Sequence, residues 1–218
     1  MLFRSVAAGA GSSRPGLIAY TFSAFVLATI MVELVRGTRA TGSLFLLVAR
    51  NRRRYGGYVV HAAIVLLAIG IAGSSAYSSS VERRLTLGQS MTVAGYTLTN
   101  RGVTVDSKAN VTETRAHLAV KGPWSGTISS GDNQYVNPPE PSREVGIKTD
   151  WLRGEDLYVI VDESHPKTGL IYVQVLVKPL VNLIWIAGIV FLFGSAVALW
   201  PDAREQRRLV ARFATAVP

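Results

Sequence analysis

Cysteine is absent from this chain of 218 residues, and the absence limits its chemistry. The protein can form no disulfide, and it offers no thiolate to a metal or to a substrate. Histidine is scarce, with only His61, His117 and His165. Asp162 and Glu163 are adjacent and are not spaced for paired acid and base catalysis. No side chain resembles a nucleophile with its base, so the sequence does not indicate catalysis by this chain alone.

Charged residues are missing from three long apolar runs, residues 15–32, 55–81 and 179–201. A helix needs about 20 residues to cross the roughly 30 Å hydrocarbon layer of a bilayer, and each run is long enough to do so. A helix satisfies its own backbone hydrogen bonds in lipid, whereas a loop or an open sheet does not. The sequence therefore predicts an integral membrane protein with three transmembrane α-helices, and a soluble helical core is the weaker alternative.

The formal net charge of +9 is unevenly distributed. Residues 82–178 hold 11 acidic and 11 basic side chains, so that segment is neutral. The excess lies in two clusters, one between the first two runs and one after the third. Their members are Arg36, Arg39, Arg50, Arg52, Arg53 and Arg54, and then Arg204, Arg207, Arg208 and Arg212. No aromatic side chains are interleaved to stack bases, so nucleic acid is not the expected partner.

Arginine and lysine near the ends of membrane spans are retained in the cytoplasm. Both clusters are therefore expected inside, which makes this a multi-pass protein of the plasma (inner) membrane. The neutral segment then lies on the periplasmic or extracytoplasmic side, and the amino terminus is outside as well. The first run is longer than the apolar core of a signal peptide and lacks a clear cleavage site, so it is interpreted as a true span.

The neutral segment changes to a period of two residues, which is typical of strands. Alternating stretches are divided by glycines, and glycine and proline clusters at residues 122–141 predict loops. The expected strands include 84–87, 91–93, 96–99, 103–105, 116–120, 144–147, 157–161 and 171–175. The fold class is thus three transmembrane α-helices plus a small antiparallel all-β exported domain, a sandwich or a barrel, between helices 2 and 3.

Five segments follow from these patterns. They are 1–54, with the first helix and a basic cytoplasmic loop; 55–77, the helix carrying His61; 78–177, the exported β domain; 178–200, the third helix; and 201–218, a basic cytoplasmic tail. Proline at position 179 suits the start of a helix. Glu33, at the cytoplasmic end of the first helix, is explained by snorkelling of its carboxylate toward water.

His61 is the most informative residue, because an ionisable side chain inside a membrane span is costly and is usually functional. At 1.5 Å per residue it lies about 9 Å from the arginine cluster. Gly57, Ala68 and Ala72 share its helical face, so a flat macrocycle has room there. Neutral imidazole is a common axial ligand of haem iron. The alternative is that His61 hydrogen-bonds a neighbouring helix and that the small residues form a packing face. His117 and His165 are interpreted as surface residues.

The segment NRRRYGGYVVHAAIVL, residues 51–66, resembles the carboxy-terminal part of the CcmF/NrfE family of cytochrome c haem lyases. Further matches follow in the same order along the chain. They are residues 88–90 with Gly95 and Tyr96, GEDLYV at 154–159, and KPLV at 178–181 with Trp185 and Gly188. The resemblance covers essentially the whole chain, and the block that ends at His61 is its most specific part.

The resemblance implies a role in covalent haem attachment during cytochrome c maturation. It also implies a membrane haem b held between histidines on two helices, with His61 as one axial ligand of the iron. The implied partners are the amino-terminal haem lyase portion or subunit, a haem carrier protein, apocytochrome c and the lipid bilayer. The chain lacks the family's Trp-rich external segment, the two histidines that flank it and the second histidine of the membrane haem.

These absences predict a split lyase subunit or a portion of the enzyme that is unlikely to be catalytic alone. The alternative function is a non-catalytic, membrane-anchored adaptor whose external β domain docks partner proteins.

Overall fold

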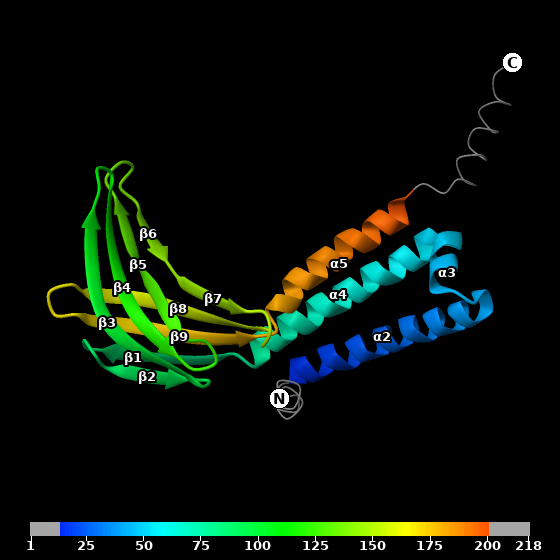
Figure 1. Cartoon of the computed structure of the whole chain (residues 1–218), viewed down its shortest axis with the longest axis horizontal. Coiled ribbons are helices and arrows are strands. Elements are labelled where there is room, and N and C mark those ends of the chain that lie inside the picture. The colour runs from blue at the N-terminus through cyan, green and yellow to red at the C-terminus, as the bar shows by residue number, and fades with distance from the viewer. Residues whose placement is uncertain (1–13, 201–218) are drawn as a thin grey trace, which may run out of the picture. The chain divides into compact units, whose positions relative to one another are not determined.

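A computed structural model describes residues 14–200 of the chain (Figure 1). Helices α2 (Arg14–Thr41), α3 (Leu44–Arg50) and α4 (Arg52–Ala76) come first, nine strands follow, and α5 (Asn182–Leu199) comes last. Within the described residues, contacts divide the chain into a β domain, 73–182, and a helical unit formed by 14–72 and 183–200. The predicted basic tail, Arg204 to Arg212, lies outside the described residues.

Helices α2, α4 and α5 contain 28, 25 and 18 residues and are each long and apolar enough to cross a membrane. This confirms the prediction of three apolar helices. The number of helices before the strands differs from expectation, because the basic segment between the first two apolar runs, predicted as a cytoplasmic loop, is partly helical. Helix α2 continues to Thr41, and α3 makes a third helix before the strands. Gly42, with φ of +76°, ends α2 and donates its N–H to the carbonyl of Thr38.

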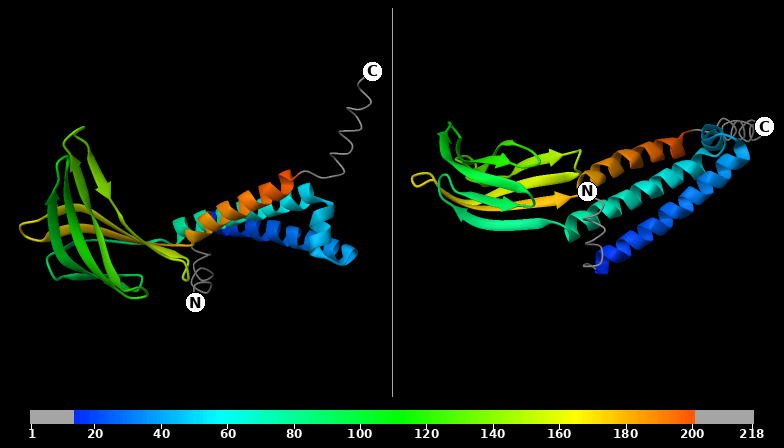
Figure 2. Two further views of the ribbon diagram at one scale, coloured as in Figure 1. Left: turned by 45° about the horizontal axis from the view of Figure 1, so that its top comes forward. Right: turned by 60° about the horizontal axis from the view of Figure 1, so that its bottom comes forward.

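The β domain is a sandwich of two antiparallel sheets, which confirms one of the two predicted architectures (Figure 2). The four-stranded sheet has the order β1 (Ser79–Leu85), β9 (Leu170–Pro179), β8 (Glu155–His165), β7 (Gly146–Asp150). The five-stranded sheet has the order β2 (Ser90–Val93), β3 (Tyr96–Ser107), β4 (Val111–Lys121), β5 (Gly126–Tyr135), β6 (Pro141–Glu144). Every strand pair in the domain is antiparallel.

The core lies between the sheets and is built by alternate residues of the strands. On β9 the buried positions are Ile171, Val173, Val175 and Val177, two residues apart, as the alternating pattern predicts. The other sheet contributes Met91, Val93, Tyr96, Leu98, Ala116, Leu118, Val120 and Ile128. Burying such side chains stabilises the domain by about 1.5–3 kcal/mol each, so the apolar alternation accounts for most of the sandwich.

Polar side chains also join the two sheets through the core. The Tyr96 hydroxyl donates to Glu155 Oε1 at 2.9 Å, and Arg153 Nε donates to the same oxygen at 2.9 Å. Burial, and then the hydrogen bond to Glu155, raises the pKa of Tyr96. Ser130 Oγ donates to the carbonyl of Glu144 and accepts the N–H of Val161 on the facing sheet. These bonds satisfy polar groups that would otherwise be costly to bury.

Three details of the predicted strands were wrong. Residues 126–135, expected as loop, form β5. Its buried positions include one large apolar residue, Ile128, and the polar residue Ser130. The expected strand 144–147 is divided at Val145, because β6 pairs in one sheet and β7 in the other. Pro179 does not begin the last helix. It ends β9, opposite Glu155, and α5 starts at Asn182.

We predict that Tyr96→Phe lowers the free energy of unfolding of the β domain by about 1–2 kcal/mol, because Glu155 is buried and loses a donor. Tyr172→Phe is the matched control. It also removes a tyrosine hydroxyl bonded to a glutamate, Glu82 Oε2, but at an exposed site, and should change stability by less than about 0.5 kcal/mol. Denaturant unfolding of the chain in detergent, followed by circular dichroism, measures both. Equal losses in the two variants would refute the bridging role of Tyr96.

Candidate functional site

Helix α4 is held on one side by close contact with α5. A Cβ atom added at Gly56 would lie 2.6 Å from the backbone nitrogen of Ala198, and one at Gly194 would lie 2.9 Å from the backbone nitrogen of Val60. Both glycines are therefore required for the two backbones to approach this closely. Ala63 and Ala187 are also buried among the helices.

Helix α2 is joined to the start of α4 by an ion pair. Arg54 Nη2 lies 2.6 Å from Glu33 Oε2, and Arg54 Nε donates to the Tyr58 hydroxyl at 2.9 Å. The guanidinium also lies over the rings of Tyr55 and Tyr58, at 6.0 and 5.7 Å from their centroids. Snorkelling alone does not describe Glu33, since its carboxylate has a defined cationic partner. The opposite charges at the ends of the first two apolar runs could have suggested this pair.

His61 lies on α4, two turns after Arg54, and its side chain is exposed. Its Nδ1 atom lies 2.8 Å from the carbonyl oxygen of Gly57. A carbonyl oxygen only accepts, so Nδ1 carries the proton in this bond. In the neutral ring, Nε2 is then left with a free lone pair, and the bond to Gly57 fixes the ring orientation. This is the arrangement that metal-binding histidines use, in which the distal nitrogen donates to a carbonyl and the other binds the metal.

The residues around His61 leave space on its side of α4. A Cβ atom at Gly57 would meet nothing within 4 Å, in contrast to the crowding at Gly56. Ala68 is exposed, and Ile64 has an exposed fraction of 50%. Next to this face, an open apolar groove of about 500 Å³ runs between α4 and α5, lined in part by Ile64, Leu67 and Gly188. A flat apolar ligand beside His61 would therefore displace no protein side chain at Gly57.

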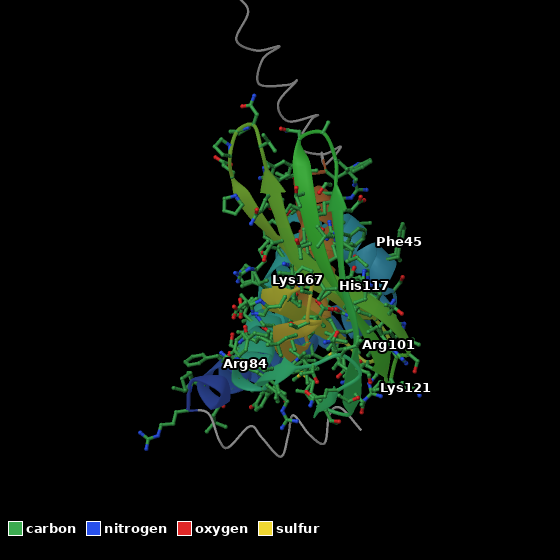
Figure 3. The ribbon with its side chains drawn as sticks, turned by 90° about the vertical axis from the view of Figure 1, so that its left-hand side faces the viewer. Phe45, Arg84, Arg101, His117, Lys121 and Lys167 are labelled. Atoms are coloured by element: carbon green, nitrogen blue, oxygen red, sulfur yellow. The ribbon has the colours of Figure 1, made fainter. Side chains whose placement is uncertain are left out.

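The other two histidines lie on the β domain and have partners there. His117, labelled in Figure 3 on the five-stranded sheet, has Nε2 at 2.9 Å from Thr104 Oγ1. His165, at the end of β8, has Nε2 at 3.1 Å from Glu163 Oε1 and is half-exposed. Among residues 14–200, no group of three or more His, Cys, Asp or Glu side chains could hold a metal ion.

The β domain matches a known protein family. Residues 76–179 match the model of the CcmF C-terminal beta-sandwich. Over this segment, just under half of the chain, the protein is similar to the carboxy-terminal part of the CcmF/NrfE family. The expected resemblance is thereby confirmed, and the sandwich at 76–179 is the segment that the family model describes.

Relatives of known sequence extend the match into the helices. The chain is 29% identical over 202 residues to the cytochrome c-type biogenesis protein CcmF of Pseudomonas aeruginosa, covering 89% of this chain and 30% of that protein. It is 26% identical over 155 residues to the probable cytochrome c-type biogenesis protein NrfE of Escherichia coli, covering 70% and 28%. The chain therefore spans about a third of the length of these relatives or less.

A solved structure, that of the cytochrome c haem lyase CcmF, has the same fold. Its TM-score with this chain is 0.71 at 23% sequence identity, and the match covers 92% of this chain and 34% of that one. The likeness thus includes helices as well as the sandwich.

The two adjacent glycines of α4 provide a test of which face is packed. Gly56→Ala should lower the stability of the helical unit by about 1–3 kcal/mol, because the new methyl group meets the backbone of Ala198. Gly57→Ala should be neutral or stabilising by up to about 1 kcal/mol, because alanine favours helix and the space is open. Thermal unfolding in detergent micelles measures both. Equal destabilisation by the two variants would show that the Gly57 face is also packed.

Proposed function

We propose that this chain is the carboxy-terminal portion or subunit of a cytochrome c haem lyase and acts in covalent haem attachment during cytochrome c maturation. The observation that carries the proposal is His61, exposed on an apolar helix with Nε2 available and Nδ1 bonded to Gly57. Support comes from the relatives, whose names give cytochrome c-type biogenesis and haem lyase as their functions.

His61 is proposed as one axial ligand of a haem b within the membrane. Iron bound by two imidazoles supplies one-electron transfer. The chain's own contribution is to hold the imidazole in one tautomer and one orientation through Gly57, and to leave the space beside Gly57 clear. The Nδ1–H bond to a carbonyl would also favour binding of iron by Nε2.

A second imidazole for the iron would come from another chain or portion, because the other histidines of this chain, His117 and His165, both lie on the β domain. We infer that the amino-terminal haem lyase portion or subunit supplies it. The further partners of the proposed assembly are a haem carrier protein and apocytochrome c. Their chemistry takes place on the side of the membrane where the β domain lies.

The arginine distribution supports a position of that domain on the periplasmic or extracytoplasmic side. A reporter that is active only after export, fused at Gly131, should therefore be active, and the same reporter fused at Gly42 should be inactive. Gly131 lies on β5, and Gly42 lies between α2 and α3. Fusions of a reporter that is active only in the cytoplasm serve as the control and should give the opposite result. The reverse pattern in both sets would overturn the proposed orientation.

Replacement of His61 tests the ligand assignment. Co-purified with its amino-terminal portion, the wild-type chain should show the sharp reduced absorption bands of a low-spin bis-histidine haem b. His61→Ala should abolish those bands while the complex still assembles, because one axial ligand is lost. His117→Ala is the matched control and should leave the bands unchanged, since His117 bonds Thr104 on the β domain.

The same experiment separates the proposed lyase role from the adaptor alternative. An adaptor whose β domain docks partner proteins predicts no spectral change in any histidine variant. Retention of the haem bands by the His61→Ala complex would leave His61 as a residue that packs or hydrogen-bonds within the membrane.

A further inference from the structure

The turn between β7 and β8 exposes two large apolar side chains that no part of the sandwich covers. Trp151 has an exposed fraction of 62% and Leu152 of 99%. Other large apolar residues of this domain are exposed as well, among them Leu87, Val136 and Ile147, but none approaches the exposed fraction of Leu152. Trp151 and Leu152, side by side at this turn, form a small apolar knob on the surface of the domain.

Hydrogen bonds give this turn a defined shape. Asp150 Oδ1 accepts the N–H groups of Leu152 and Arg153 at 3.0 and 3.1 Å. The Asp150 carbonyl accepts the N–H of Gly154, whose φ is +68°. The two apolar side chains are thus presented by a closed, hydrogen-bonded turn, which lowers the entropy that binding would cost.

The same turn is bonded to the residues that lead into α5. The N–H of Leu180 donates to the Gly154 carbonyl at 2.6 Å, and Asn182 Nδ2 donates to the Asp150 carbonyl at 3.1 Å. Asn182 is buried and is the first residue of α5, the helix that is long and apolar enough to span a membrane. The turn is therefore fixed at the level where the apolar helix begins, which is the boundary between water and lipid if α5 is a span.

Tryptophan is enriched at this boundary, because its ring is amphipathic and sits at the level of the lipid headgroups. The charges of the turn do not favour binding to anionic lipid. Arg153 is paired with Glu155, and Asp150 adds a negative charge, so the turn has no excess of positive charge. An apolar and aromatic contact with lipid fits this composition better than an electrostatic one.

We propose that the β7–β8 turn inserts Trp151 and Leu152 into the headgroup region of the lipid bilayer beside the start of α5. The turn anchors the membrane-proximal end of the sandwich at a fixed depth. This inference rests on the proposed membrane span of α5 and adds a second, non-spanning contact with lipid.

The absence of cysteine allows a direct test with single-cysteine variants of the full chain. Leu152→Cys carries an environment-sensitive fluorophore in phosphatidylcholine vesicles, and lipids brominated near the headgroup serve as the quencher. The expected result is a blue shift of the emission and loss of its intensity. Leu87→Cys is the matched control, because Leu87 is also an exposed leucine in a turn, with an exposed fraction of 61%. The register of β1 on β9 puts it at the opposite end of the sheet, about 30 Å from the turn. It should show neither effect.

A third label separates failure of this inference from failure of the proposed span. Leu192→Cys lies in the middle of α5 with an exposed fraction of 70%, and lipids brominated near the ends of their chains should quench it. Quenching at 192 without quenching at 152 would overturn the lipid anchor and leave the span standing. Lack of quenching at both positions would overturn the span and the anchor together. A label at 152 that is shielded from an aqueous quencher and also from brominated lipid would overturn the anchor in favour of a protein contact.

Trp151→Phe provides a check without a label. The intrinsic fluorescence of the wild-type chain should contain a component quenched by shallow bromines that this variant lacks. A component of the same size in both proteins would contradict the insertion of Trp151.

Discussion

The pairing of β1 with β9 is the constraint on which the arrangement of this protein depends. Strand β1 directly follows α4 and β9 leads into α5, and their antiparallel register places Ser79 opposite Val177. Paired residues on such strands lie about 5 Å apart, so the chain enters the β domain and leaves it again at the same end of one sheet. Nearly a hundred residues of sandwich can then be inserted between two helices that pack closely through Gly56 and Gly194. The sandwich closes its own core, and the helices need no side chain of the sandwich to pack against each other.

The small residues of α4 belong to two different faces, and this distinction bears on the role of His61. Gly56 is in contact with α5, whereas Gly57, one residue later, faces open space and gives its carbonyl to the imidazole. A helix-packing explanation accounts for Gly56 within this chain but not for the neighbourhood of His61. Either another helix or a ligand covers that face in the membrane, because an imidazole with a free Nε2 is costly to leave in lipid.

Sequence patterns predicted the elements whose burial follows a regular period. The three apolar helices and the alternating valines of β9 are of this kind, since a single period decides which side is buried. Strand β5 was missed, because Ser130 is buried through hydrogen bonds to Glu144 and Val161 and not through apolar contact. The predicted start of α5 was too early, because proline is compatible both with the first turn of a helix and with the last residue of a strand. His61 was found from its cost in lipid, but its tautomer depends on the 2.8 Å bond to Gly57, which only coordinates reveal.

In the proposed haem site, this chain would supply a single imidazole, and the other half of the site would have to complement it. The exposed face around His61 offers one nitrogen ligand, open space at Gly57 and an apolar surface at Ile64. A porphyrin has two faces and an apolar edge, so a second helix that completes the site must bring another neutral ligand and comparably small side chains. The ion pair with Glu33 neutralises Arg54, the arginine of α4 nearest to His61 along the helix, whereas Arg52 and Arg53 add positive charge at the same helix end. The proposed haem would thus lie near a positively charged helix end, and the strength of its binding would depend strongly on the second ligand.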